Sequence, residues 1–403
     1  MIATFFSLQA TRIGGLALGY ASIVWLSRTA GPAAVGEYLF LLNCVIVIGT
    51  LASLGIPTLV QRLSAGLGEH RIGAGTLLAL RRRWPVIMVI SAMGVTALLA
   101  LDREHPLTFA SVAELAASAA AFSFTLVLVE TLRISHGPGL SEVQRSLVRP
   151  GLILVLLVVG MGAAAALALG VLGALLLSLW QARDVLRQDP GGDEGLKTYV
   201  DERGRDLFTV FFLGALVLVF GAMDIVFFGI LEDATETGIY GAASRYGMLV
   251  NVALLAGNAQ MVRHLARVAS TDDAESMQQL RRQIRMVRLT STGLLLALIV
   301  AFPIYAWALN LPATRLFPYF VIVAVSFWLQ GVIGPVNMFL MQAHEAGRLI
   351  GYHLCGLVVF GLVVSVLFVH PTTFAIPFGI AAGANAIKIL AWLRIRRSRG
   401  LRI

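Results

Sequence analysis

Four charged side chains interrupt long apolar stretches of this sequence: Arg12, Glu114, Asp224 and Arg245. Where such a stretch lies in a lipid bilayer, a charge costs at least about 2.5–3.5 kcal/mol and needs a partner or a function. A guanidinium group can bind phosphate oxygens in bidentate geometry, and a buried carboxyl group holds its proton more tightly than one in water. The chemistry indicated is anion binding together with proton coupling.

Arg12 is predicted to lie about 6 Å inside the first apolar stretch, at 1.5 Å per helical residue. The helical face that continues from it carries Gly15, Gly19 and Ser22, small residues that let another helix or a ligand approach closely. Two interpretations are open. Arg12 either binds phosphate or extends to the headgroups at the nearer membrane surface.

Asp224 and Arg245 are predicted to lie on neighbouring helices joined by a short turn, each about 8–10 Å from the external membrane surface. One interpretation is a structural ion pair that holds the two helices together. The other is that Arg245 gives a central cavity positive potential, while Asp224 modulates that potential or takes up a proton.

Further polar side chains occur at helical spacing. Glu114 shares one face with Ser111 and Ser118, which indicates that this face meets protein or water rather than lipid. Glu114 is therefore a second candidate for proton coupling. Gln330 and Asn337 form a similar face if residues 316–342 are one helix. The amide side chains that either line a cavity or bond between helices are Asn43, Asn251, Gln330 and Asn337.

Composition indicates that lipid is the solvent of this chain. Of its 403 residues, 58% are hydrophobic and 13% are charged, whereas soluble domains have about 25% charged residues. At about 20 residues per span, the chain has room for loops but not for a separate folded domain. The apolar stretches predicted to span the membrane are 8–28, 37–60, 84–101, 107–129, 150–163, 167–182, 207–229, 238–261, 287–309, 316–342, 349–369 and 374–393.

Arginine and lysine orient these twelve spans, because they concentrate in alternate loops and in the C-terminal tail. Positively charged loops stay on the cytoplasmic side, so an even number of spans must separate each pair of them. The stretch 150–182 must then be two short spans with a turn near Gly162–Leu167, and both termini are cytoplasmic. The net charge of +9 is a topology signal and does not indicate nucleic-acid binding.

The chain also repeats itself at half its length. Gly36-Glu37-Tyr38 at the start of the second span matches Gly238-Ile239-Tyr240 at the start of the eighth. Six spans per half, both halves starting inside, form a parallel repeat typical of alternating-access transporters. We expect an N-terminal six-helix lobe in 1–182, a cytoplasmic linker in 183–206 and a C-terminal six-helix lobe in 207–403.

The run from Leu26 to Tyr38, LSRTAGPAAVGEY, resembles the AR-x-LGP-x-x-FG-x-Y signature of polysaccharide-export flippases, with Val35 in place of Phe. These are the Wzx-like members of the MOP (multidrug/oligosaccharidyl-lipid/polysaccharide) exporter superfamily, which also contains MATE drug exporters. The segments 61–65 and 224–240 are similar to two further motifs of the family. The resemblance implies an all-α polytopic membrane protein of about twelve helices with a MATE-like fold.

The resemblance also implies a function. Such a flippase moves a polyprenyl-diphosphate-linked oligosaccharide from the cytoplasmic to the external leaflet of the bacterial inner membrane, for surface polysaccharide assembly. Its expected partners are that lipid-linked oligosaccharide, the bilayer and polysaccharide polymerase or assembly proteins. No cofactor is expected apart from a coupling ion, H+ or Na+. The alternative on the same fold is a MATE-like cation-coupled drug exporter, which predicts an anionic cavity where the flippase predicts a cationic one.

An enzyme is not expected. The seven histidines are scattered and show no metal-ligand spacing. Membrane polymerases and ligases that join saccharides have a large external loop with catalytic residues. The longest external loop predicted here, 229–237, is short and acidic.

Overall fold

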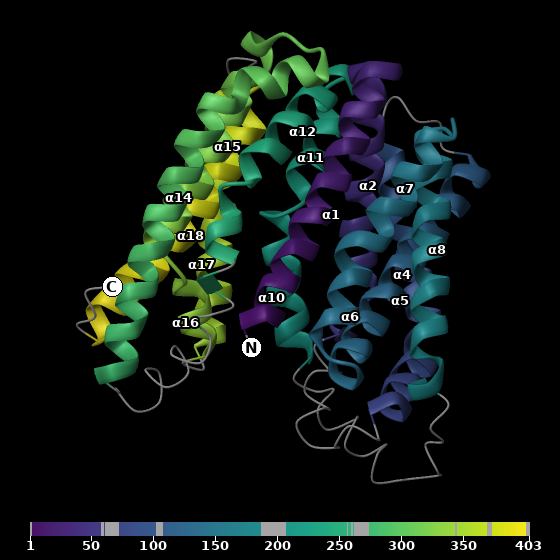
Figure 1. Ribbon diagram of the computed structural model, residues 1–403, viewed down its shortest axis with the longest axis horizontal. Coiled ribbons are helices and arrows are strands. Elements are labelled where there is room, and N and C mark those ends of the chain that lie inside the picture. Colours follow the sequence, from purple (N-terminus) through teal and green to yellow (C-terminus); the bar gives the residue numbers. More distant parts are fainter. Residues whose placement is uncertain are drawn as a thin grey trace. The chain divides into compact units, whose positions relative to one another are not determined.

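A computed structural model shows helices joined by turns (Figure 1). It describes residues 2–57, 60, 72–101, 108–186, 207–255, 257–258, 261, 274–342, 345–368 and 373–399. By internal contact the chain divides into two compact units. Unit 1 comprises Met1–Leu218 and Gly229–Thr237, and unit 2 comprises Val219–Phe228 and Gly238–Ile403.

The helices of unit 1 begin where turn chemistry predicts. Gly31 and Gly137 have positive φ angles of 86° and 85°, and each is followed by a proline in the first helical position. Glycine tolerates that backbone conformation, and proline suits the first turn of a helix. The helices are α1 (Ile2–Thr29), α2 (Pro32–Ala52), α4 (Ile72–Leu101), α5 (Phe109–Ser135), α6 (Pro138–Val143), the π-helical η2 (Gln144–Val148), α7 (Arg149–Val158), α8 (Ala163–Leu186) and nearly all of α10 (Leu207–Val219).

Unit 2 contains a break in a predicted span. Residues 316–342 form two helices, because Gly334 adopts a φ of 95° and ends the first of them. Arg288 Nε donates a hydrogen bond of 2.6 Å to the carbonyl of Val332, which caps that end. The helices are most of α11 (Met223–Leu231) and α12 (Ala234–Met248), then α14 (Ala274–Leu309), α15 (Ala313–Ile333), α16 (Val336–Gln342), α17 (Ala346–Phe368) and α18 (Ala375–Arg399).

The chain is a multi-pass membrane protein. Among the described residues, eight helices are long and apolar enough to cross a membrane, and the pair α10–α11, bent by 52°, makes up to nine. The predicted spans 8–28, 150–163 and 238–261 correspond to α1, α7 and α12, which are shorter or less apolar than those eight. The all-α architecture is confirmed, and the count of twelve spans stays a prediction.

The stretch 150–182 forms two helices as predicted, α7 and α8, but their boundaries differ from the prediction. The turn between them lies at Val159–Gly162, where Gly160 has a φ of 95°. Helical structure also begins earlier than expected, because α6, η2 and α7 follow one another without a break. The π-helical η2 is the unforeseen element. Such segments are rare and are frequent at functional sites.

The predicted external loop 229–237 is largely helical, so the prediction of a loop there was wrong. Only Glu232 and Asp233 separate α11 from α12. Asp233 Oδ1 accepts a hydrogen bond of 2.8 Å from the backbone NH of Glu236. This is the bond by which an aspartate starts a helix, and it explains why helix replaces loop.

The half-length repeat has a structural counterpart. Gly36 lies four residues after the start of α2, and Gly238 lies four residues after the start of α12. Tyr38 and Tyr240, two residues further on, are both buried. By contact, α10 belongs almost wholly to unit 1, and the lobes 1–182 and 207–403 with the linker 183–206 stay a prediction.

Candidate functional site

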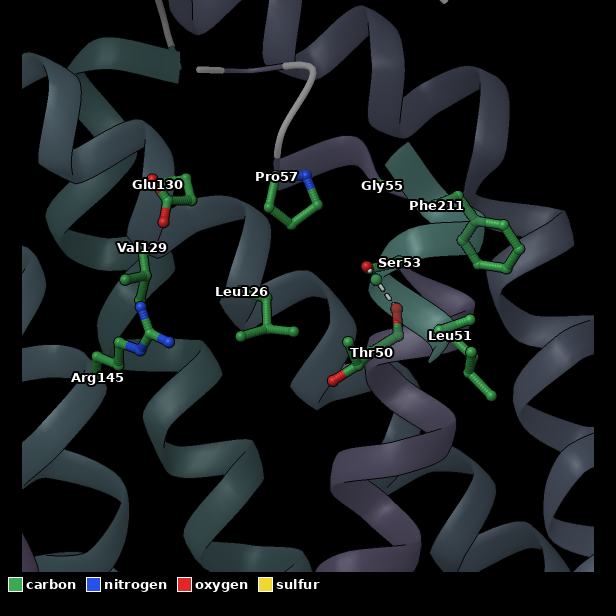
Figure 2. Close-up of a pocket in the computed structure, with 12 residues that line it drawn as sticks. Thr50, Leu51, Ser53, Gly55, Pro57, Leu126, Val129, Glu130, Arg145 and Phe211 are labelled. Carbon is green, nitrogen blue, oxygen red and sulfur yellow. Dashed lines mark hydrogen bonds between the residues drawn. The ribbon is translucent and has the colours of Figure 1, made fainter. Parts of the chain in front are cut away.

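Unit 1 contains a cavity of about 210 Å³ between α2, α5, η2 and α10 (Figure 2). The chain turns beside it because Leu54 and Gly55 have positive φ angles of 50° and 73°. The hydroxyl of Ser53 donates a hydrogen bond of 2.7 Å to the carbonyl of Thr50. The residues that line the cavity are Thr50, Leu51, Ser53, Gly55, Pro57, Leu126, Val129, Glu130, Arg145, Phe211, Gly214 and Ala215.

Two charged side chains, Glu130 and Arg145, lie on one side of this cavity (Figure 2). Glu130 is 8% exposed, and its Oε2 lies 3.0 Å from Nε of Arg133. Because Arg133 offsets the charge of Glu130, Arg145 leaves the cavity wall with a net positive charge. Neither cavity residue was selected from the sequence, because both fall in the loop predicted after the span 107–129, where charged residues are ordinary and an arginine is expected from the positive-inside rule.

Arg12 forms a bidentate ion pair with Glu142 of α6. Nε donates to Oε1 at 2.9 Å and Nη2 donates to Oε2 at 3.1 Å, and the Ser146 hydroxyl donates to Oε1 at 2.7 Å. Burial raises the pKa of Glu142, but the hydrogen bonds from Arg12 and Ser146 outweigh it and hold that pKa below its ordinary value of 4.5. Neither interpretation of Arg12 from the sequence included this carboxylate.

A close approach of α1 to η2 holds the pair in place. A Cβ atom at Gly15 would overlap the carbonyl oxygen of Ser146, so only glycine permits this approach. Gly19, one turn further along α1, has open space around it. The prediction that the small-residue face of α1 admits a close neighbour is confirmed at Gly15. On its other side η2 is joined to α8 by a hydrogen bond of 2.6 Å between Gln144 and Gln181.

Arg149 completes a group of four arginines in this part of unit 1. Its guanidinium carbon lies 5.0 Å from the centre of the Phe122 ring, a cation–π distance. The members of this arginine cluster are Arg12, Arg133, Arg145 and Arg149. Two carboxylates pair with members of this group, Glu142 with Arg12 and Glu130 with Arg133, so the group carries an excess of positive charge that favours an anion.

Unit 2 holds a carboxylate with a different environment. Asp224 lies in the first turn of α11, directly after the bend that separates α11 from α10. Its Oδ2 accepts hydrogen bonds from the hydroxyls of Tyr240, at 2.7 Å, and Ser244, at 3.3 Å. The Tyr240 ring is buried and stacks on Phe228 with 4.6 Å between ring centres. Broken helices with a polar group at the break commonly hold the ions or substrates of transporters.

Arg245 follows Ser244 on α12 and is partly buried. The hydroxyl groups that donate to Asp224 belong to Tyr240 and Ser244. Neither was predicted as its partner from the sequence, where Tyr240 was noted only as part of a motif. The predicted pairing of Arg245 with Asp224, and the predicted place of Arg245 in a cavity, stay predictions.

Glu114 and Asn43 lie in unit 1 in contrasting environments. Glu114 is exposed on the surface of α5, although Ser118 on the same face is buried. Asn43 is 1% exposed, and its Nδ2 donates to the carbonyl of Leu39, one turn earlier, at 2.6 Å. Part of the hydrogen-bonding capacity of Asn43 is therefore used within its own helix.

The other three amide residues lie in unit 2 and are partly buried: Asn251, Gln330 and Asn337. The predicted polar face that joins Gln330 to Asn337 is wrong, because the helix breaks at Gly334 and the two residues belong to different helices. The Asn337 side-chain oxygen is buried and has no hydrogen-bond partner among the described residues. It is a polar atom at a break that could accept a further bond.

One lysine that was counted from the sequence with the basic C-terminal tail lies within a membrane span. Lys388 lies in the middle of α18, inside the predicted span 374–393. His353 on the adjacent α17 is 3% exposed, and its ring centre lies 6.4 Å from that of Phe220 in the α10–α11 bend. The two helices approach closely at glycines: a Cβ at Gly356 would lie 2.9 Å from the carbonyl oxygen of Gly383. The sequence could have identified Lys388, since a lysine within a predicted membrane span requires an explanation.

Comparisons with known proteins identify the fold. No family model and no curated protein matches the sequence. A solved structure of a multidrug resistance MATE family transporter of the MOP superfamily matches with a TM-score of 0.71 at 15% identity, covering 98% of this chain and 97% of the other. A Vibrio cholerae MATE transporter matches with a TM-score of 0.59 at 17% identity and 98% coverage of both chains.

A third structure is a MOP superfamily transporter from Pyrococcus furiosus, described as having a binding pocket of reversed polarity that suggests a different function. It matches with a TM-score of 0.59 at 17% identity, covering 98% of this chain and 95% of the other. At such identities the similarity shows the fold alone. The chain has the fold of these MATE transporters over nearly its full length, as the sequence resemblance implied.

Proposed function

We propose that this protein is a membrane transporter that moves a polyprenyl-diphosphate-linked oligosaccharide between leaflets by alternating access. The MATE-type fold supports transport as the general activity. The Gly-x-Tyr motifs, which recur at the same helical position in α2 and α12, support the flippase branch of the superfamily.

The positively charged wall of the unit 1 cavity is the observation that carries the choice of substrate. A diphosphate requires cations that present donors in planar geometry, and arginine meets that need better than lysine does. Arg145 lines the cavity, Arg12 pairs with Glu142, three residues before Arg145, and Arg149 begins α7, the helix that follows η2. Both carboxylates in the group, Glu130 and Glu142, are ion-paired with arginine, so they do not make it a site for cations.

The route of the substrate follows from the same charges. Diphosphate and sugar would pass through the protein while the lipid tail stays in the bilayer, because the free energy of an apolar polyprenyl chain is lower in lipid than in water. The positive-inside rule puts the arginine cluster on the cytoplasmic side, where such a substrate is loaded. Polysaccharide polymerase or assembly proteins would then receive the product at the external face of the bacterial inner membrane.

Coupling to an ion is assigned to the carboxylates outside the arginine cluster. Asp224 is the first candidate, because its hydroxyl partners can serve either a protonated carboxyl group or a carboxylate that holds Na+. Glu114, exposed on α5, is the second. Exchanging Asp224 for Asn should leave substrate binding intact and remove any dependence of transport on the ion gradient.

The experiment that tests the substrate class compares two arginine variants in cells. Arg145→Ala should abolish surface polysaccharide and cause lipid-linked oligosaccharide to accumulate, while the protein remains in the membrane. Arg183→Ala is the matched control, because Arg183 is exposed at the end of α8 and pairs with Asp184 outside the cavity. Normal polysaccharide in the Arg145→Ala strain would contradict the proposal.

A MATE-like exporter of organic cations is the second candidate. It is favoured by the similarity to transporters described as multidrug resistance proteins and by Asp224, a carboxylate at a helix break. This function predicts that Asp224→Asn sensitises cells to cationic drugs and that Arg145→Ala does not. The flippase instead predicts that Arg145→Ala abolishes polysaccharide export and that neither substitution changes sensitivity to cationic drugs.

A further inference from the structure

We propose that Glu142 is an internal competitor of phosphate for Arg12, so that its carboxylate and the diphosphate of a substrate take turns on the same guanidinium group. The inference rests on the proposed function and adds a device that regulates binding at that site. Three features of the structure carry it: the geometry of the pair, the position of Arg145 and the attachment of the carboxylate to a π-helical segment.

The geometry of the pair is the geometry that a phosphate group would use. Arg12 presents Nε and Nη2 side by side, and both donate to the two oxygens of Glu142, at 2.9 and 3.1 Å. The same pair of donors binds two oxygens of a phosphate group in parallel. The Arg12 side chain is 42% exposed and that of Glu142 only 12%, so an incoming anion can reach the guanidinium group.

Arg145 links this pair to the cavity. It lines the cavity, and its charge is among those that hold the pKa of Glu142 down, after the larger effects of burial and of the Arg12 and Ser146 bonds. Glu142 is therefore influenced by two arginines. A diphosphate with one charge on each phosphate group can engage both, whereas a single carboxylate makes its bidentate contact with only one.

Tethering sets the balance between the two anions. Glu142 is attached to the protein and acts at high effective concentration, so it lowers the apparent affinity for any anion that must displace it. A substrate with two phosphate groups overcomes this competition, and abundant small anions with a single charge do not. The carboxylate thereby makes the site selective for diphosphate.

Displacement would also change the contact between α1 and η2. Ser146 donates to the Glu142 carboxylate, and the backbone of Ser146 lies against Gly15 of α1. Releasing Glu142 from Arg12 removes the two hydrogen bonds that Arg12 of α1 donates to α6, the helix that leads directly into η2. Substrate binding is thus transmitted to a π-helical segment, a rare type of element that is frequent at functional sites.

Binding of farnesyl diphosphate to the purified full-length protein in detergent, measured by calorimetric titration, tests the proposal. Glu142→Gln should bind about tenfold more tightly than the natural protein, because an uncharged competitor is weak. Arg12→Gln should bind at least about tenfold more weakly. Adding Glu142→Gln to Arg12→Gln should tighten binding by much less than tenfold, since the carboxylate makes its bidentate contact with Arg12. Asp184→Asn, which alters net charge equally at an exposed site, should bind as the natural protein does.

Ser146→Ala gives a second measurement should Glu142→Gln fail to fold, because it loosens the carboxylate without removing it. It should tighten binding by about twofold to threefold, the smaller effect of one neutral donor. Unchanged or weaker binding by both Glu142→Gln and Ser146→Ala would overturn the competitor, as would equal tightening by Asp184→Asn. If farnesyl diphosphate still binds more weakly to Arg12→Gln than to the natural protein in these cases, the proposed function is not contradicted. If no variant binds farnesyl diphosphate, both the competitor and the proposed function fail.

Discussion

The two units treat a carboxylate in opposite ways. In unit 1 Glu142 is held by the Arg12 guanidinium and a serine hydroxyl. In unit 2 Asp224 receives hydrogen bonds from the hydroxyls of Tyr240 and Ser244 at a break in a span. A carboxylate held by arginine keeps its charge and can be exchanged for another anion. A carboxylate surrounded by hydroxyls can instead exchange a proton or a metal cation.

On the basis of this difference we propose two tasks for the two parts of the chain. The arginine cluster of unit 1 suits the anionic group of a substrate, and the Asp224 site of unit 2 suits the coupling ion. Tyr38 and Tyr240 occupy matching positions of the half-length repeat, and Tyr240 donates a hydrogen bond to the Asp224 carboxylate.

The largest effect is expected at the approach of α1 to η2. Gly15→Val should destabilise unit 1 by about 3 kcal/mol, the upper end of overpacking costs, because the obstacle at Ser146 is backbone and cannot rotate away. Gly19→Val, with open space around it, should have little effect. Thermal unfolding of the purified protein in detergent measures both. Equal midpoints for the two variants would contradict the close approach.

Arg12→Ala should cost about 1–2 kcal/mol of stability. The value lies below the 3–5 kcal/mol typical of breaking a fully buried pair, because Arg12 is 42% exposed. The cost arises from leaving the Glu142 carboxylate without its cation, so adding Glu142→Gln should recover part of it. A double-mutant cycle on unfolding midpoints checks this, and strictly additive effects would rule out a direct pair.

Tyr240→Phe should cost about 1 kcal/mol, the usual value of one hydrogen bond. The ring contacts with Phe228 and Tyr319 are kept, so the loss reports only the bond to Asp224. The substitution should have no further effect in an Asp224→Ala background, which lacks the acceptor, if this bond accounts for the whole loss of stability. A loss of the same size in both backgrounds would show that Tyr240 acts through packing instead.

The smallest effect concerns pH. Because the pKa of Glu142 is lowered in the folded protein, its ion pair contributes stability above pH 4.5 and loses that contribution as pH falls through the folded value. The difference in unfolding midpoint between the natural protein and Glu142→Gln should therefore shrink in acid. A difference that stays constant from pH 7 to about pH 3 would show that Glu142 does not carry its charge into the pair.

The sequence predicts the fold better than the site, for a physical reason. Apolar runs and arginine-rich loops mark spans directly, so the two helices in 150–182 follow from charge counting. Side-chain partners depend on which helices meet, and spacing along one helix does not show that. Arg12 stands out because arginine is costly in a span, whereas its partner Glu142 lies in a stretch predicted as loop and is ordinary there. The π-helical η2 was not predicted from the sequence. This element places Ser146 against Gly15 and within hydrogen-bond distance of Glu142.

Translocation of a lipid-linked oligosaccharide tests the central claim most directly. The protein would be reconstituted in lipid vesicles with polyprenyl-diphosphate oligosaccharide, and exposure of the sugar to an impermeant enzyme would be followed over time. The account predicts transfer by the natural protein and by Arg183→Ala, and loss of transfer by Arg145→Ala. Transfer that is unchanged in Arg145→Ala, or absent from the natural protein while organic cations are moved, would contradict it.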